Sequence, residues 1–194
     1  MKKDDLPGIP TTEALEAELK RVQNKDRYHA SLRRTVYILI TVAAAAVLLA
    51  TLFLPVLRIY GTSMEPTVQS GDIVVAIKNS DIDSGDVIAF YHNNKILVKR
   101  VIGRAGDWID IDEAGTVTVN GTELNEPYLS DRALGHTDIE LPFQVPDGKF
   151  FVMGDHRETS VDSRNTAVGC VSQEQIVGKV VWRVWPFAHI GKIR

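Results

Sequence analysis

The sequence GTSMEPT, residues 61–67, lies between the longest apolar run of the chain and a series of short apolar segments separated by turn residues. Gly61 and Pro66 favour a sharp turn around Ser63. A serine hydroxyl is a weak nucleophile unless a neighbouring base takes its proton, so a catalytic Ser63 requires a base elsewhere in the chain. This stretch therefore separates an N-terminal helix from a β domain and supplies a candidate nucleophile.

The segment KILVKRVI, residues 95–102, offers that base. Alternation along a strand places Leu97, Lys99 and Val101 on one face, where the ammonium group of Lys99 is desolvated. Desolvation disfavours the charged form and lowers the lysine pKa, which an amine needs before it can act as a base near neutral pH. Two simpler interpretations stay open: an ordinary polar turn at Ser63, and a Lys99 that extends its ammonium group to solvent at a strand edge.

The apolar run from Val36 to Leu57 contains 22 residues and no charge. As a helix it spans roughly 33 Å, which is enough for the core of a bilayer. We therefore expect a transmembrane helix over residues 36–57, preceded by a separate short helix over residues 12–31. A cleavable signal sequence is the alternative, because four alanines occupy residues 43–46, but the run begins late and is long for such a segment.

The charge distribution predicts the orientation in the membrane. Arg33 and Arg34 stand directly before the apolar run, whereas Arg58 is the only basic residue close to its other end. By the positive-inside rule, residues 1–35 are cytoplasmic and residues 58–194 are extracytoplasmic. Residues 58–194 carry fourteen Lys and Arg against nineteen Asp and Glu, so nothing in them indicates nucleic-acid binding.

Metal and cofactor chemistry finds no support in the sequence. Cys170 is the only cysteine, so it forms no internal disulfide and no thiolate cluster, and it is most simply a small core residue. The five histidines show no metal-ligand spacing, and the carboxylates form no metal motif. We therefore expect neither a metal nor a cofactor.

Short apolar runs separated by turn signals predict an all-β domain after residue 58. Asn93-Asn94 and Asn120-Gly121 are hairpin turns. We expect residues 108–147 to form a small β cap inserted between the segments that carry the chemistry. The expected strands cover residues 73–77, 87–91, 96–102, 108–111, 116–119, 122–124, 149–153 and 176–185.

Three sequence blocks occur in a fixed order and carry a family resemblance. Ser-x-Met-x-Pro follows the membrane segment, VKRVIG occupies residues 98–103, and GDHRETSVDSR occupies residues 154–164. Together they resemble the bacterial type I signal peptidases, over about residues 58–190. The resemblance implies the signal-peptidase/LexA-like β fold and cleavage of signal peptides from secreted preproteins after small residues, usually alanine, at the first and third positions before the scissile bond.

The resemblance also assigns roles to five residues. Ser63 matches the family's nucleophile and Lys99 its general base. Ser160 matches a serine that bonds the lysine, and Asp162 and Arg164 match a pair that supports the geometry of the site. The expected partners are secretory preproteins and the lipid bilayer, with no nucleic acid.

The sequence departs from the family pattern at two positions. His156 stands where many members have asparagine, at a position that carries no chemistry. Gly61 stands where some members have a serine whose hydroxyl joins the oxyanion hole, so the Ser63 backbone N–H remains as the donor and the second donor is open.

Two other functions compete with this one. A self-cleaving Ser/Lys protease like the LexA-type repressors shares the chemistry, although the apolar run and the lack of a DNA-binding module count against it. A membrane-anchored β domain that binds a partner without catalysis would survive substitution of Ser63. Trp182, Trp185 and Phe187 either belong to the core or rest on lipid headgroups, and the oligomeric state does not follow from the sequence.

Overall fold

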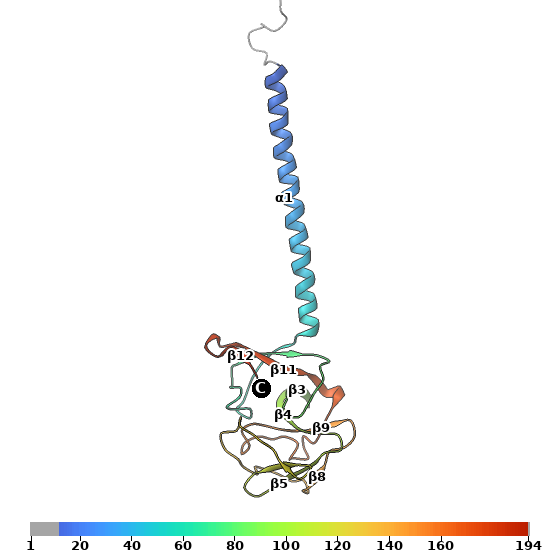
Figure 1. The fold of residues 1–194 in the computed structure, drawn as a ribbon, viewed down its shortest axis with the longest axis vertical. Coiled ribbons are helices and arrows are strands. Elements are labelled where there is room, and N and C mark those ends of the chain that lie inside the picture. Colours follow the sequence, from blue (N-terminus) through green and yellow to red (C-terminus); the bar gives the residue numbers. More distant parts are fainter. Residues whose placement is uncertain (1–11, 194) are drawn as a thin grey trace, which may run out of the picture. The chain divides into compact units, whose positions relative to one another are not determined.

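The computed structural model describes residues 12–193 (Figure 1). The chain divides into two compact units, Met1–Ala50 and Thr51–Arg194. The first contains most of a long helix, and the second contains all the strands. Residues 1–11 and 194, which belong to the predicted cytoplasmic and extracytoplasmic segments, lie outside the described residues.

Helix α1 runs without a break from Thr12 to Phe53. The prediction of a separate helix over residues 12–31 is therefore wrong, because no glycine or proline interrupts this range and the polar segment continues into the apolar one. The helix ends before Leu57, since Pro55 disfavours a helical conformation at the preceding residue. Among the described residues, α1 alone is long and apolar enough to cross a membrane, with a mean hydropathy of 2.5 over its best 18-residue window.

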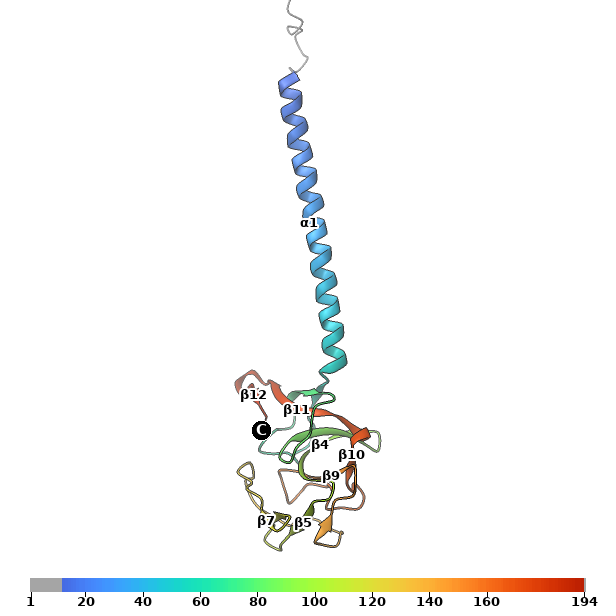
Figure 2. The ribbon, with the colours of Figure 1, turned by 45° about the vertical axis from the view of Figure 1, so that its right-hand side comes forward.

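The main sheet has eight strands, and each of its pairings is antiparallel. The order is β1-β2-β11-β3-β4-β9-β10, and β12 pairs with β11. Figure 2 labels β4, β9, β10, β11 and β12 of this sheet. These strands are β1 (Val56–Arg58), β2 (Ile73–Ile77), β3 (Val87–His92), β4 (Lys95–Arg104), β9 (Lys149–Met153), β10 (Val171–Ser172), β11 (Ile176–Trp185) and β12 (Gly191–Lys192).

A second sheet of four strands has the order β7-β6-β5-β8. Within the β unit, β5 and β8 lie at one end and β11 and β12 lie at the other (Figure 1). The residues between the two halves of the main sheet, expected as an inserted cap, thus contain a sheet of their own. Its strands are β5 (Trp108–Ile111), β6 (Val117–Val119), β7 (Thr122–Glu123) and β8 (Phe143–Gln144).

The expectation of an all-β domain with one N-terminal apolar helix is confirmed. Strands β2, β5, β9 and β11 have the predicted bounds, and Asn93 and Asn94 adopt the positive φ values of a tight hairpin turn. The sequence did not indicate β1, β8, β10 or β12, because two or three residues are too few to show alternation. Two 3₁₀ turns, η1 (Gln173–Gln175) and η2 (Phe187–His189), complete the described elements.

The hydrophobic core of the β unit fixes the turn that contains Ser63. Met64 and Val68 are buried in one cluster with Val74 and Val180, which come from β2 and β11. Burying each of these side chains contributes on the order of 1.5–3 kcal/mol, so the turn is attached to the sheet on both sides of its proline. A second cluster joins the two sheets through Ile102, Ile109 and Phe151.

Candidate functional site

Ser63 lies in an irregular turn between β1 and β2. The Glu65 amide donates to the Thr62 carbonyl at 3.0 Å, and the Val68 amide donates to the Met64 carbonyl at 3.0 Å. The Ser63 carbonyl accepts a hydrogen bond from the His156 amide at 3.1 Å. The turn is therefore held on its apolar side by Met64 and Val68 and on its polar side by the loop after β9.

Lys99 occupies the middle of β4, opposite Ile88 of β3, and is 3% exposed. Its Nζ donates to Ser160 Oγ at 3.0 Å. Burial lowers the pKa of Lys99 to about 8; the charge of Asp162 acts in the opposite direction, and Arg164 lowers the pKa further. This lowering has the direction and the cause expected for a lysine that acts as a base, and the interpretation of Lys99 as a solvent-exposed edge lysine is wrong.

Ser63 and Lys99 line the same cavity, which has a volume of about 620 Å³. The cavity lies between two segments, residues 56–64 and residues 94–99, and its lining includes the apolar side chains of Ile59, Leu97 and Val98. None of its described lining residues is acidic. A serine and a desolvated lysine thus share one largely apolar cavity.

Ser160, Asp162 and Arg164 form a buried hydrogen-bonded series behind Lys99. Ser160 Oγ donates to Asp162 Oδ2 at 2.6 Å, so its only proton is used and it meets Lys99 as an acceptor. Arg164 Nε donates to Asp162 Oδ1 at 2.9 Å. Burial pushes the pKa of Asp162 upward, but the hydrogen bonds and the charge of Arg164 outweigh it and hold that pKa below its ordinary value.

Gly154 is the point where the serine turn and this series meet. Its amide donates to Asp162 Oδ2 at 2.9 Å. A Cβ at this position would clash with both Ser160 Oγ and the Ser63 carbonyl oxygen. Only glycine therefore lets Ser63, Ser160 and Asp162 approach each other this closely. All five residues proposed from the sequence are brought together.

Comparison with known proteins identifies the family. A model described as signal peptidase, peptidase S26, matches residues 32–185. The chain belongs to the S26 signal peptidases. Signal peptidase IB of Staphylococcus aureus (strain COL) is 39% identical over 151 residues, which cover 68% of this chain and 78% of that protein. Signal peptidase I of Bacillus licheniformis is 34% identical over 168 residues, which cover 80% and 89%.

One solved structure of a signal peptidase I, from Enterococcus faecalis V583, is also similar. It shares 29% sequence identity with this S26 chain, and the match covers 52% of this chain and 97% of that chain with a TM-score of 0.42.

The backbone conformation at position 61 explains why this signal peptidase has glycine where some family members have serine. Gly61 has a φ of +89°, in the left-handed region that a residue with a Cβ adopts only with strain. A Cβ there would meet nothing within 4 Å, so space is not what excludes a serine. The backbone at this position therefore favours glycine, which offers no side-chain donor.

Several buried polar residues near the site were not identified from the sequence. Arg100, beside Lys99, donates to Asp155 through Nε at 2.9 Å and through Nη2 at 2.7 Å. Arg157 forms a buried ion pair with Glu126, which lies between β7 and β8 in sequence. The block GDHRETSVDSR already contained Asp155 and Arg157, whereas no local pattern distinguished Glu126.

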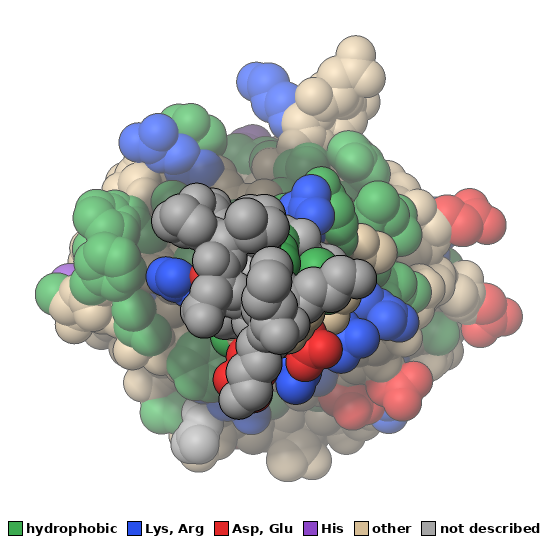
Figure 3. All heavy atoms as spheres, turned by 90° about the horizontal axis from the view of Figure 1, so that it is seen from above, with side chains coloured by type: hydrophobic (Ala, Val, Ile, Leu, Met, Phe, Trp, Pro, Cys, Tyr) green, Lys and Arg blue, Asp and Glu red, His purple; other side chains and the backbone are tan. Residues whose placement is uncertain are grey.

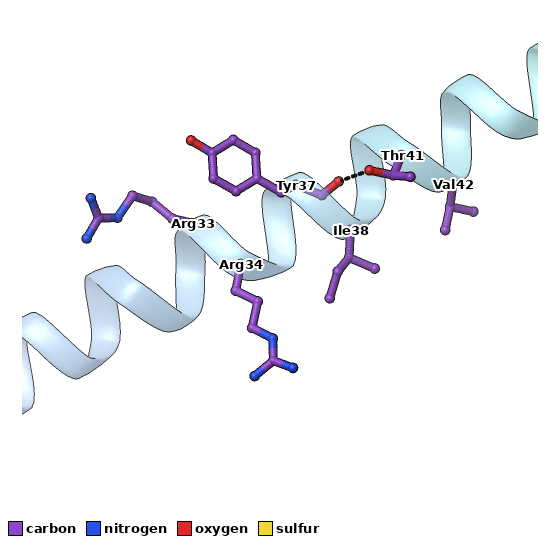
Figure 4. Close-up of a pocket in the computed structure, with 6 residues that line it drawn as sticks. All are labelled: Arg33, Arg34, Tyr37, Ile38, Thr41 and Val42. Atoms are coloured by element: carbon purple, nitrogen blue, oxygen red, sulfur yellow. Dashed lines mark hydrogen bonds between the residues drawn. The ribbon is translucent and has the colours of Figure 1, made fainter.

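The loop after β9 also carries a histidine, and a separate hollow lies on α1. His156 uses Nδ1 in a 2.7 Å hydrogen bond with Thr159, and within residues 12–193 no cluster of His, Cys, Asp and Glu could hold a metal. A shallow hollow on α1 is bounded by side chains of that helix alone, with Arg33 and Arg34 pointing in different directions (Figure 4). It is lined by Arg33, Arg34, Tyr37, Ile38, Thr41 and Val42.

The C-terminal aromatic residues are exposed and do not belong to the core. Trp182 and Trp185 are each nearly half exposed, and Phe187 packs edge-on against Trp185 at 4.7 Å between ring centroids. Figure 3 shows hydrophobic as well as basic and acidic side chains at the surface of the molecule. Whether these aromatics touch a membrane stays a prediction.

Proposed function

We propose that this protein is a membrane-anchored signal peptidase I, a serine endopeptidase that removes signal peptides from secreted preproteins with a Ser63/Lys99 dyad. The observation that carries the proposal is Lys99: a buried amine with a pKa of about 8, in the same cavity as Ser63, in a chain of the S26 family. A neutral amine at that position is the base that a serine nucleophile requires.

The hydrogen bond between Lys99 and Ser160 sets the direction of proton transfer. Because Ser160 Oγ accepts one N–H of the amine, the nitrogen lone pair is directed away from Ser160. Lys99 then takes the proton of Ser63, and Ser63 Oγ forms a bond to the scissile carbonyl carbon. The Ser63 backbone N–H is a donor for the resulting oxyanion.

Collapse of this intermediate breaks the amide bond. Lys99 gives its proton to the leaving amine, which departs as the N-terminus of the mature protein, and the signal peptide stays attached to Ser63 as an ester. A water molecule then gives a proton to Lys99 and attacks the ester carbonyl carbon. The ester bond breaks, the signal peptide is released, and Lys99 passes the proton from water to Ser63 Oγ. No metal or cofactor takes part in these steps.

The substrate proposal rests on the cavity lining and on the family. The apolar side chains of the cavity favour an apolar peptide segment. The preference for small side chains follows from the family, whose substrates end their signal peptides in such residues. We assign residues 1–35 to the cytoplasm, 36–57 to the membrane and 58–194 to the extracytoplasmic side, where secreted preproteins emerge. The charge asymmetry across the apolar run supports this orientation.

The decisive experiment incubates the detergent-solubilised protein with a preprotein whose signal peptide ends in Ala-x-Ala, and maps the new N-terminus by mass spectrometry. We expect a single cut after the last alanine, and no cut by Ser63→Ala or Lys99→Ala. Self-cleavage at one internal bond as the main reaction would instead favour the LexA-like alternative. If the wild type bound the preprotein without cleaving it, and Ser63→Ala bound it equally well, the result would favour a non-catalytic binding domain.

A further inference from the structure

A buried ion pair connects the second-sheet region to the loop that supports the dyad. Both Arg157 and Glu126 have side chains only 1% exposed. The guanidinium uses both terminal nitrogens on the carboxylate: Nη1 donates to Glu126 Oε2 at 3.1 Å, and Nη2 donates to Glu126 Oε1. A two-point contact of this kind fixes the orientation of Arg157 as well as neutralising its charge.

Tyr128 extends this contact to the strand that carries Lys99. Its hydroxyl donates to Glu126 Oε1 at 2.8 Å, and Arg100 Cζ lies 3.8 Å from its ring centroid. Arg100 is adjacent to Lys99 in β4 and is itself held by Asp155. The segment of Glu126 to Tyr128 therefore contacts both Arg157 and Arg100.

The third guanidinium nitrogen of Arg157, Nε, begins a series of hydrogen bonds that connects the ion pair to Lys99. Arg157 Nε donates to the Gly154 carbonyl at 3.1 Å. The Gly154 amide donates to Asp162, which accepts from Ser160, which in turn accepts from Lys99. Each member of this series is buried, so a shift of the Gly154 peptide has no solvent-filled space in which to be absorbed.

A second group of bonds ties the same loop to the residues that follow Tyr128. Arg164 Nη1 donates to the Leu134 carbonyl at 2.7 Å, and the Asp138 amide donates to the Arg164 carbonyl at 3.1 Å. Asp138 also accepts from the amide and the hydroxyl of Thr166, at 2.7 and 3.0 Å. The segment from residue 126 to residue 138 thus contacts the loop of residues 154–166 along much of its length.

We propose that Glu126 and Tyr128 are positioning residues for catalysis, which act through Arg157 and Arg100 to hold Ser160 and Lys99 in place. The inserted cap of residues 108–147 would then contribute to the reaction indirectly, by supporting the loop of residues 154–166 from outside. This inference rests on the proposed Ser63/Lys99 dyad. If Glu126 had only a structural role, its substitution would lower the stability of the protein and leave the turnover of the folded enzyme unchanged.

The test compares Glu126→Gln with Glu123→Gln in the full-length, detergent-solubilised enzyme. Glu123 lies in the same region but forms an exposed ion pair with Arg132, so the same substitution serves as a matched control. Both are measured at a temperature where circular dichroism shows the wild-type fold. We expect Glu126→Gln to lower kcat about tenfold to a hundredfold with little change in KM, because small misplacements of reacting groups cost rates of this size. Glu123→Gln should match the wild type.

Two further variants make the result specific. Because Glu126 acts through Arg157, the double variant Glu126→Gln/Arg157→Gln should be no slower than Arg157→Gln alone, whereas independent roles would multiply the two losses. Tyr128→Phe keeps the ion pair and the ring over Arg100 and removes one hydrogen bond, so we expect kcat to fall about threefold. Tyr128→Phe decides the question if Glu126→Gln does not fold.

The same assay separates this inference from the dyad. If Ser63→Ala is inactive and Glu126→Gln and Tyr128→Phe turn over like Glu123→Gln, or if their losses lie in KM alone, the positioning role is overturned and the dyad stands. If Ser63→Ala keeps normal turnover, the dyad is overturned and the positioning role with it. Multiplied losses in the double variant would also overturn the role assigned to Glu126.

Discussion

Lys99 and Arg100 are neighbours on β4, both are buried, and their surroundings differ completely. Arg100 meets Asp155 through two hydrogen bonds, the Gly85 carbonyl through a third, and the ring of Tyr128. Lys99 meets a single neutral hydroxyl, that of Ser160. The two residues project to opposite faces of the strand, so one β-strand presents a cation paired with a carboxylate on one side and an amine with no hydrogen-bonded carboxylate on the other.

This difference in surroundings suits Arg100 to a structural role and Lys99 to a chemical one. A paired guanidinium remains charged and joins the strands and loops around it, whereas a desolvated amine with no carboxylate bonded to it loses its proton more readily. Nearby Asp162 keeps this loss moderate, and the result is a pKa of about 8 rather than the ordinary 10.5. The predictions below remove the difference or measure it.

Making position 99 a permanent cation should have the largest effect. Lys99→Arg keeps the positive charge, but a guanidinium stays protonated at any pH used in an assay and cannot take the Ser63 proton. We expect kcat/KM to fall by at least about a thousandfold, because a nucleophile and its base act as a unit and the loss of either one removes most of the catalysis. Preprotein cleavage measures it, with circular dichroism as the control for folding. Near-normal activity of Lys99→Arg would contradict the assignment of the base.

Removing the carboxylate that neutralises Arg100 should lower the stability of the fold. Asp155→Asn leaves the Arg100 charge buried without its carboxylate, and breaking a buried pair in this way costs about 3–5 kcal/mol. Urea unfolding measures the free energy. The matched control is Asp83→Asn, which breaks the exposed pair with Arg104 and should cost less than about 1 kcal/mol. Equal losses in the two variants would show that the burial of the pair at Arg100 is without consequence.

The pH profile of the wild type reports the titration of Lys99. Because the base must be neutral, kcat/KM should rise with pH through an apparent pKa of about 8 and fall about tenfold for each unit below it. We would measure the profile from about pH 6 to 11, with an optimum expected above about pH 8. A rise centred near the ordinary histidine pKa would show that a different group is the base.

Stability should depend on pH with a sign that follows from the same shift. Below pH 8 the folded and unfolded states both carry the Lys99 proton, and the folded state bears the full cost of the buried charge, about 3 kcal/mol for a pKa lowered from 10.5 to about 8. Between these values the unfolded state binds more protons, so the free energy of unfolding rises with pH. Above 10.5 the cost has disappeared.

Lys99→Met should therefore be more stable than the wild type at acidic pH. After about 1 kcal/mol for the lost hydrogen bond to Ser160, we expect a gain of about 2 kcal/mol near pH 6. The gain should vanish, or reverse, by about pH 11, where the wild-type amine is neutral in both states. Urea unfolding at the two pH values provides the measurement, and a difference independent of pH would mean that burial does not disfavour the Lys99 charge.

Much of the site follows from the sequence because its parts are local. Ser63 stands on a turn marked by glycine and proline, and alternation in residues 95–102 places Lys99 in a buried strand. The short strand β1 could not be predicted, since Val56 and Leu57 continue the apolar run that forms α1. The contact of Glu126 with Arg157 joins residues 31 positions apart that both lie outside the strands, so no local pattern in the sequence predicts it.

The direction of the hydrogen bonds behind Lys99 determines where a transferred proton can go. Ser160 accepts from Lys99 and donates to Asp162, a geometry that would allow a relay toward the carboxylate. Arg164 holds the pKa of Asp162 low, however, and an anion stabilised in this way is a poor proton acceptor. In the proposed dyad, the proton that leaves Ser63 therefore stays on the Lys99 nitrogen until the departing amine takes it. We expect it to be transferred only twice, from Ser63 to Lys99 and from Lys99 to the amine, without passing through the interior of the protein.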